Sequence, residues 1–355
     1  MTKISITMLV YEKTNLRYLS ASLNSILNQT FTDWELIIAD GCNDNREQLI
    51  KYLTGFDTRV RYIKQGFKGF DGAFNLAYLY TEGDIICSIG DDDIYEDTFL
   101  AKAYDAISSG DNAISYCDVM IIDNRDNVLQ HLVIPDISST EPISGITSLL
   151  FMKSQGLITH SSMCSRRRCF EFMLDNLPLN QIYLGDFPYY SVVMGKFKSI
   201  KINDSLVKYR VHNNMMSFAS SSPRNKQLVS GLKSICSLFK PEELLPFASD
   251  EIKSLNLPED ILLTKLLHWR LRVLEKENDG ATACLYGHKL AADPDHIFRS
   301  ARIEAEAVLT KKLKRDGISY YRLNKKLLVL EPTIEKIANA CNLKLHGVKL
   351  TNDPI

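Results

Sequence analysis

Three features that would place a protein in a class at once are missing from this sequence: an excess of one charge, a metal-binding cysteine pattern and a long apolar run. Lys and Arg total 42 against 43 Asp and Glu, a formal net charge of −1, so no global charge attracts nucleic acid or an anionic membrane. The eight cysteines form no CxxC pair and no His/Cys cluster with zinc-ligand spacing. We therefore expect no nucleic-acid partner, and free thiols in a reducing compartment.

The apolar runs are short throughout the chain. No stretch approaches the roughly 18 to 20 apolar residues that cross a bilayer. The N-terminal run ISITMLV is followed directly by Tyr11, Glu12 and Lys13, which predicts a buried strand and not a signal peptide. A cytoplasmic protein is expected, and peripheral attachment at the inner face of a membrane stays open. Three glycines in GFKGFDG fit neither GxGxxG nor a P-loop and predict turns: Gly66, Gly69 and Gly72.

What the sequence does contain is an alternation of strand and helix patterns over its first part. The 355 residues favour two domains. Short β-branched runs alternate with apolar residues at helical spacing, which predicts a mostly parallel, doubly wound α/β sheet. Residues 1–217 are expected as this domain, and residues 218–355, which include the linker-like SSSPRN near their start, as a mostly helical one. Strands are predicted at 4–10, 34–40, 59–63, 84–90 and 113–122, and helices after Thr14 and at 46–53, 73–80 and 98–108.

Acidic side chains stand where two predicted strands end. Asp91, Asp92 and Asp93 directly follow the run DIICSIG, and Asp40 ends WELIIAD. Ligands of open parallel sheets bind outside the carboxyl ends of the strands, and adjacent carboxylates there favour a hard cation such as Mg²⁺ or Mn²⁺. Two other interpretations stay open. The triplet can be a solvated acidic turn or a helix N-cap, and Asp40 before glycine can be a simple turn.

Several ordered motifs resemble the family-two glycosyltransferases, inverting enzymes with the GT-A (nucleotide-diphospho-sugar transferase) fold, of the type that builds bacterial surface glycans. The motifs are ISITMLVY, SLNSILNQTFTDWELIIADG, GFDGAFNLAYLYTEGDIICSIGDDD, THSSMCSRR, YLGDFPYYSVVMGKF and LVKYRVH. The resemblance covers roughly residues 3–217. It implies transfer of a hexose or N-acetylhexosamine from a UDP-sugar to a hydroxyl of a glycan, glycolipid or glycoprotein, assisted by Mn²⁺ or Mg²⁺.

The resemblance also implies roles for individual residues. On the donor side, Asp40 matches the residue that contacts uracil. Asp93, with Asp91, matches the metal ligand, and His212 matches a histidine near the metal or diphosphate. In catalysis, Asp186 matches the general base. The other nucleotide-side positions are Tyr11, Glu12, Asp71, Asn75, Asp91 and Asp92, and the acceptor-side positions are His160 and Arg166.

Two departures from the family pattern keep rival functions open. Gly90 stands where Asp or Asn is usual, and Phe74 replaces a frequent Arg. A catalytically inactive scaffold with this fold is one alternative, because function depends on the site and not the fold. A sugar-nucleotide nucleotidyltransferase is another, although the N-terminal loop lacks the glycines and arginines that grip a triphosphate. The C-terminal helices, with their leucine stripe, are expected to form a core or a contact between subunits.

Overall fold

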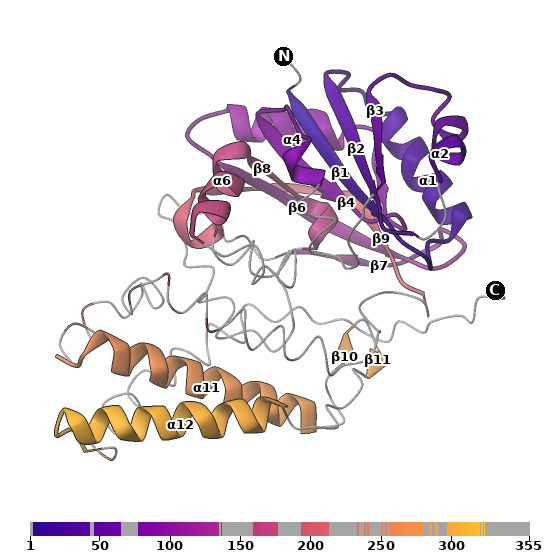
Figure 1. Cartoon of the computed structure of the whole chain (residues 1–355). Helices are drawn as coiled ribbons and strands as arrows, with labels where there is room; N and C mark the ends of the chain where they lie inside the picture. The colour runs from indigo at the N-terminus through magenta and orange to yellow at the C-terminus, as the bar shows by residue number, and fades with distance from the viewer. Residues whose placement is uncertain are drawn as a thin grey trace.

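Figure 1 shows the computed structural model of the chain, a sheet flanked by helices and, beyond it in sequence, a pair of long helices. The structure describes residues 3–42, 46–64, 77–134, 136, 159–176, 193–212, 233, 238, 240, 250, 253, 256–279, 284–285, 288–289, 297–319, 321 and 323. Statements about structure below concern these residues.

The first half of the main sheet is parallel, as predicted. Its strands lie in the order β3-β2-β1-β4, and each pairs in parallel with its neighbour. Their bounds are β1 (Ile4–Val10), β2 (Trp34–Asp40), β3 (Val60–Lys64) and β4 (Ile85–Ile89). Residues of β1 and β2 are almost all buried, which is why these strands appear in the sequence as continuous apolar runs.

The second half of the sheet is mixed, which the strand pattern alone did not predict. Strand β8 lies antiparallel between β4 and β6, whereas β9 runs parallel to β6 and pairs antiparallel with β5. Strand β7 pairs with β6 at the side. The bounds are β5 (Ile94–Tyr95), β6 (Ile114–Ile122), β7 (Val128–Leu132), β8 (Met163–Arg166) and β9 (Ser199–Arg210). Because β8 is antiparallel to β4, its first residues lie near the carboxyl end of β4.

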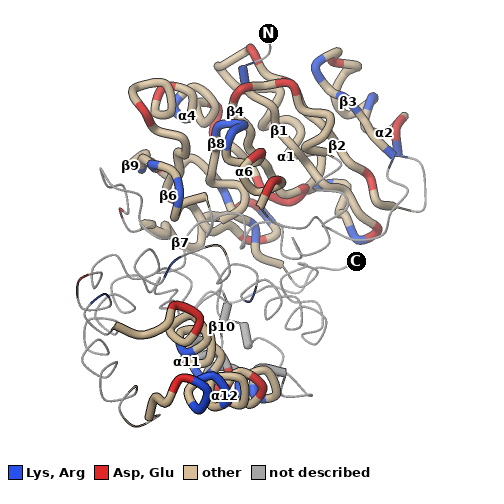
Figure 2. The backbone as a smooth tube through the Cα atoms, turned by 60° about the vertical axis from the view of Figure 1, so that its left-hand side comes forward, with Lys and Arg blue, Asp and Glu red and all other residues tan. Residues whose placement is uncertain are grey.

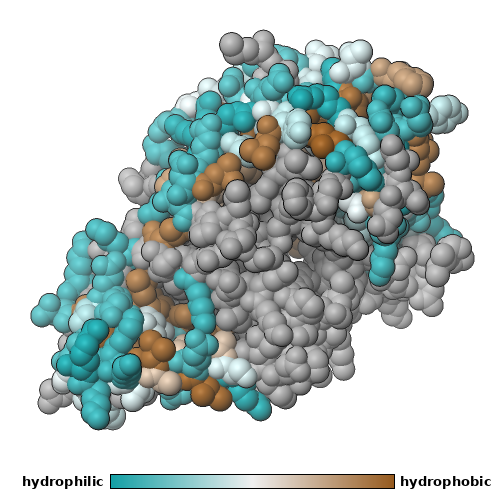
Figure 3. Space-filling model, viewed as in Figure 1, coloured by the Kyte–Doolittle hydropathy of each residue, from teal (hydrophilic) through white to brown (hydrophobic). Residues whose placement is uncertain are grey.

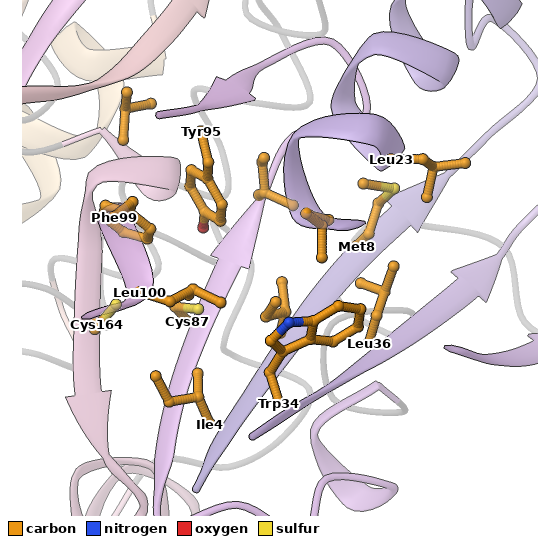
Figure 4. Close-up of a cluster of buried hydrophobic side chains, with 14 of the residues drawn as sticks. Ile4, Met8, Leu23, Trp34, Leu36, Cys87, Tyr95, Phe99, Leu100 and Cys164 are labelled. Atoms are coloured by element: carbon orange, nitrogen blue, oxygen red, sulfur yellow. The ribbon is translucent and has the colours of Figure 1, made fainter. Parts of the chain in front are cut away.

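A hydrophobic core joins one face of the sheet to helices α1 and α4. Alternate residues of β1, such as Ile4 and Met8, pack with Leu23 of α1 and Phe99 of α4 (Figure 4). On the opposite face, Ile37 and Ala39 pack with Ala77. Both faces are thus covered, as the doubly wound pattern predicts. The helices are α1 (Leu16–Leu27), α2 (Glu47–Leu53), α4 (Phe99–Ser108), α6 (Arg167–Asn176) and the 3₁₀ turn η1 (His160–Ser162).

The N-cap of α1 lies one residue beyond Thr14, after which the sequence predicts the helix. Asn15, not Thr14, caps the helix, because its side-chain oxygen accepts the backbone N–H groups of Arg17 (3.0 Å) and Tyr18 (3.4 Å). The Thr14 hydroxyl instead donates to the carboxylate of Asp91. Thr14 therefore serves the acidic turn rather than the helix.

The C-terminal part contains a helical pair with a small core of its own. Helices α11 (Glu259–Asp279) and α12 (Ile297–Arg315) pack against each other, and Ile261, Leu309, Leu313 and Leu323 fill their contact. Ion pairs join the helices at both ends, from Glu275 to Arg302 (2.5 Å) and from Asp260 to Lys312 (3.1 Å). A two-residue hairpin adds β10 (Cys284–Leu285) and β11 (His288–Lys289). The leucine stripe therefore contributes to a core, one of the two alternatives expected for it.

The described surface is mixed in charge and mostly hydrophilic. Figure 2 shows acidic and basic residues interspersed along the backbone, and Figure 3 shows hydrophilic side chains over most of the described atoms on that face. No helix among the described residues is long and apolar enough to cross a bilayer. Among the cysteines whose side chains the structure describes, five are free and buried, as expected: Cys42, Cys87, Cys117, Cys164 and Cys169.

Candidate active site

The predicted acidic positions meet at the carboxyl edge of the parallel strands. Val10 pairs in register with Asp40, and Met8 with Ile89, so the ends of β1, β2 and β4 lie side by side. The loop after β1, Asp40 of β2 and the acidic turn Asp91–Asp93 after β4 therefore share one edge of the sheet. His212 joins them because β9 ends at Arg210, next to this turn.

The acidic turn is buried, which excludes the solvated-turn interpretation. Asp91 is 6 % exposed and Asp93 3 %. Helix α4 starts later, with Thr98 at its N-cap position, so the triplet is not a helix cap either. Burial, and then the negative charge of Asp92, raise the pKa of Asp91 well above its usual range. The turn therefore holds carboxylates whose charge the protein does not fully compensate.

Each of the other two aspartates has a defined set of partners. Asp93 accepts hydrogen bonds from the Ser161 hydroxyl (2.5 Å) and from the backbone N–H of Arg210 (3.0 Å). Burial and the charge of Asp92 raise the pKa of Asp93 to about 8, so the surroundings of this carboxyl disfavour its ionised form. Asp92 lies 3.0 Å from Nε2 of His212. The three carboxyl groups thus face different partners around one short turn.

Asp40 lies in a polar corner between β2 and β3. Its carboxylate accepts the Cys42 N–H (2.8 Å), the Tyr62 hydroxyl and the Lys64 ammonium (3.4 Å). Burial by itself raises the pKa of Asp40, but the hydrogen bonds from Cys42 and Tyr62 and the charge of Lys64 outweigh it, so the pKa is below its usual range. The side chain is completely buried. Asp40 is therefore ionised and acts only as a hydrogen-bond acceptor. These contacts give it a larger role than that of a residue in a simple turn.

Tyr11 and Glu12 form the start of the loop after β1. The Tyr11 N–H donates to Thr14 (3.0 Å), whose hydroxyl reaches Asp91. Burial, and then the charges of Asp91 and Asp92, raise the pKa of Tyr11, so the phenol stays protonated beside the acidic turn. Glu12 is exposed. The loop therefore links β1 directly to the acidic turn.

Gly90, the departure from the family pattern, has a steric reason in this structure. A Cβ atom at this position would lie 2.7 Å from Oδ1 of Asp92 and 3.2 Å from Oδ2 of Asp93. The backbone of Gly90 also accepts the Ser22 hydroxyl (3.1 Å). Absence of a side chain at position 90 is what lets the next carboxylates fold back over the turn.

Comparison with known proteins identifies the sheet domain. The sequence profile described as glycosyl transferase family 2 matches residues 5–169. These residues form a family 2 glycosyltransferase domain. Among curated relatives, an uncharacterised glycosyltransferase of Nostoc sp. is 27 % identical over 212 residues, 58 % of this chain and 65 % of that protein. The chain spans less than two thirds of that relative.

Two further relatives extend the comparison. The Escherichia coli protein WfgD, named as a UDP-Glc:alpha-D-GlcNAc-diphosphoundecaprenol beta-1,3-glucosyltransferase, is 30 % identical over 111 residues, 31 % of this chain and 44 % of that protein. In three dimensions the chain is similar to residues 1–349 of S. aureus TarS, solved with UDP, with a TM-score of 0.53, 15 % identity and coverage of 90 % and 93 %. This likeness supports the GT-A fold, as predicted.

The two predicted acceptor-side residues, His160 and Arg166, lie at opposite ends of β4 in the glycosyltransferase domain. His160 begins η1, next to Ser161, and so lies close to the acidic turn. Arg166 pairs in register with Ile85, at the opposite end of β4. Its guanidinium donates to the carbonyls of Asn112 (3.0 Å) and Ile107 (2.9 Å). The structure therefore does not bring Arg166 to the site.

Three other predicted site residues lie outside the described part of the chain: Asp71, Asn75 and Asp186. Conversely, the site contains Ser161 and Arg210, which the sequence motifs did not single out. Both stand inside motifs given above, Ser161 beside His160 in THSSMCSRR and Arg210 two residues before His212 in YRVH. Arg210 ends the strand that leads to His212, and its place at a strand end, like that of the aspartates, is the signal that could have identified it.

The residues of the acidic turn have the chemistry of a site for a divalent cation. Among the described residues, no three His, Cys, Asp or Glu side chains stand together as a ready ligand set. The chemistry of the acidic turn nevertheless fits, because carboxylate oxygens suit Mg²⁺ or Mn²⁺. The raised pKa values of Asp91 and Asp93 mark negative charge that a cation would stabilise.

Proposed function

We propose that the chain transfers a hexose or N-acetylhexosamine from a UDP-sugar to an acceptor hydroxyl, with inversion of configuration. The observation that carries the proposal is the meeting of an ionised acceptor, Asp40, and a buried acidic turn, Asp91–Asp93, at one edge of the sheet. A nucleoside diphosphate presents the matching groups, an imide N–H on uracil and a diphosphate that needs a cation.

The donor nucleotide would lie along the carboxyl edge of the strands. Asp40, held as a pure acceptor by Tyr62 and Lys64, would accept the uracil N–H, and Tyr11 and Glu12 would border the base. Asp92 would meet the ribose or diphosphate. Asp71 and Asn75 would lie near the donor sugar, as the family resemblance implies.

A divalent cation, Mn²⁺ or Mg²⁺, would be held by Asp93 with Asp91 or His212, and when bound it stabilises the negative charge of the departing diphosphate. The buried carboxyls supply the oxygens, and the Ser161 hydroxyl and Arg210 N–H keep Asp93 oriented. Where Asp93 and Asp91 hold the cation, His212 would keep its contact to Asp92.

The reaction itself would be one displacement. The acceptor oxygen forms a bond to the anomeric carbon while the bond from that carbon to the diphosphate oxygen breaks, so that UDP leaves. Asp186 would take the proton of the acceptor hydroxyl. General-base help of this kind contributes about 10²- to 10⁴-fold in rate.

The acceptor is proposed from the relatives. WfgD is named for transfer to a diphosphoundecaprenol-linked sugar, which makes a lipid-linked glycan at the cytoplasmic face of a membrane the first acceptor to test. A soluble glycan and a glycoprotein are the comparison acceptors.

The test is calorimetric titration of UDP, GDP and several UDP-sugars, with Mn²⁺ and with EDTA, followed by analysis of the released product. We expect UDP binding that requires metal, and release of UDP with transfer of sugar. Asp93→Asn should abolish the metal dependence, whereas Asp204→Asn, an exposed aspartate of β9 paired with Lys102, should not. Pyrophosphate release would indicate a nucleotidyltransferase, and no nucleotide binding at all would indicate a scaffold.

A further inference from the structure

The most completely enclosed charge beside the acidic turn is Arg210, the last residue of β9. Its side chain is 0 % exposed. Its backbone N–H donates to Asp93 Oδ1 (3.0 Å), and its Nε donates to the carbonyl of Asp92 (2.9 Å). One residue therefore contacts both the side chain of Asp93 and the main chain of Asp92.

The same guanidinium reaches two other segments of the chain. Its Nη1 donates to the carbonyl of Asp123 (2.9 Å) and lies 2.5 Å from a carboxylate oxygen of Asp126, both in the turn between β6 and β7. Its face lies over the ring of Tyr18 of α1, 4.4 Å from the centroid. Asp126 is held further by Arg17 of α1 (2.9 Å). Arg210 thus connects the acidic turn, the β6–β7 turn and α1.

His212 belongs to the same arrangement. It follows Arg210 by two residues, its ring lies 5.1 Å from that of Tyr18, and its Nε2 meets Asp92 at 3.0 Å. The ring of Tyr18 therefore packs against both the guanidinium of Arg210 and the imidazole of His212. A shift of Arg210 would move both the carbonyl of Asp92 and the ring against which His212 rests.

We propose that Arg210 is a positioning residue of the donor site: it holds the acidic turn in the shape that presents Asp92, Asp93 and His212 to a nucleoside diphosphate and its cation. This inference rests on the proposed function for the ligand, but not for the positioning itself. A lysine cannot replace Arg210, because an ammonium has neither the planar fork nor the flat face that the guanidinium uses here.

Amide hydrogen exchange of the free protein measures the positioning directly. The Gly90 N–H donates to Ser161 Oγ (3.1 Å) and the Asp93 N–H to the Gly90 carbonyl (3.3 Å), so their exchange rates report the order of the turn. Arg210→Lys should accelerate exchange at both amides at least about tenfold, the effect of losing one charge-assisted hydrogen bond.

The matched control is Lys201→Met. Lys201 lies on the same strand, roughly 30 Å before Arg210, and like Arg210 it is a buried cation in an ion pair, here with Asp118 (2.9 Å; side chains 6 % and 11 % exposed). Its loss destabilises β9 without changing a contact of the acidic turn. Equal acceleration at Gly90 and Asp93 in both variants, or none in Arg210→Lys, would overturn the positioning role.

Two further measurements keep the outcome decisive. If Arg210→Lys fails to fold, Asp126→Asn removes one charged partner of the guanidinium at a half-exposed turn position where asparagine tolerates the positive φ of 71°. It should accelerate the same amides about threefold, roughly half the effect of a full hydrogen bond on a logarithmic scale, and an unchanged rate would then overturn the inference.

Binding of UDP with Mn²⁺ is measured on the same proteins. In Arg210→Lys the affinity should fall about tenfold or more, while Lys201→Met binds as the unaltered protein does. If the unaltered protein binds no UDP, the proposed function fails, and the exchange rates still decide the positioning role.

Discussion

Two glycines of the domain offer a sharp test, because an added methyl group meets atoms at the same distance but of different kinds. At Gly90 the nearest atom to an added Cβ would be Oδ1 of the Asp92 side chain, at 2.7 Å. At Gly83 the nearest atoms include the backbone nitrogen of Ser5 at 2.7 Å and the carbonyl carbon of Ile4 at 2.9 Å. A carboxylate can rotate away, whereas the backbone of a central strand cannot.

Gly90→Ala should therefore damage the site and spare the fold. Rotation of Asp92 breaks its contact to His212, a charge-assisted hydrogen bond of about 1.5 to 3 kcal/mol. The affinity for UDP with Mn²⁺ should fall about tenfold to a hundredfold. The backbone at Gly90 is not in the positive-φ region, so the melting temperature should change by no more than about 4 °C.

Gly83→Ala should do the reverse. Overpacking against β1 costs about 1 to 3 kcal/mol or more and should lower the melting temperature by at least about 5 °C, with UDP affinity near normal in the folded fraction. The assay is calorimetry with UDP and Mn²⁺ beside thermal unfolding. Normal affinity in Gly90→Ala would refute the claim that the glycine is needed for the placement of Asp92.

Three further outcomes are expected. Asp186→Asn should reduce turnover at least about a hundredfold in a steady-state transfer assay while UDP affinity stays the same; near-normal turnover would remove Asp186 from the base role. Burial lowers the pKa of His268 in α11, so the folded protein binds fewer protons than the unfolded chain and stability declines as pH falls below about 6.5. Between pH 7.5 and pH 5.5 the melting temperature should fall less in His268→Leu than in the control His131→Gln, which changes an exposed histidine. An equal fall in both variants would contradict this. Arg166→Ala should lower the melting temperature, because its two carbonyl contacts are lost, and leave the acceptor KM unchanged; a raised KM would return Arg166 to the acceptor site.

The sequence predicted the parallel half of the sheet well because three of its four strands, β1, β2 and β4, are buried on both faces. The run WELIIAD became β2 with the predicted bounds, and its last residue, Asp40, stands at the edge of the sheet as expected. The mixed half could not be predicted the same way. Strand β8 has only four residues, and its antiparallel direction depends on long-range pairing with β4 and β6 rather than on any local pattern.

The site was predicted only in part, because some of its residues are marked by local sequence and others only by long-range contacts. The strand-end aspartates are local signals, because a carboxylate after a buried strand can be recognised from its neighbours in sequence. Thr14, Ser161 and Arg210 became site residues through contacts to the acidic turn across 77, 68 and 117 residues of chain. No local pattern states which distant side chain will supply a hydrogen bond.

Taken by itself, the sequence determined the class of fold, the family and the edge of the sheet at which the acidic residues collect, since hydrophobic periodicity and short-range motifs are properties of consecutive residues. Only the tertiary structure decided that the acidic turn is buried, that Asp40 is held ionised by Tyr62 and Lys64, and that Arg166 lies at the other end of β4. Burial and charge pairing are set by the neighbours that folding brings from elsewhere in the chain, and those neighbours determine the pKa of a carboxyl.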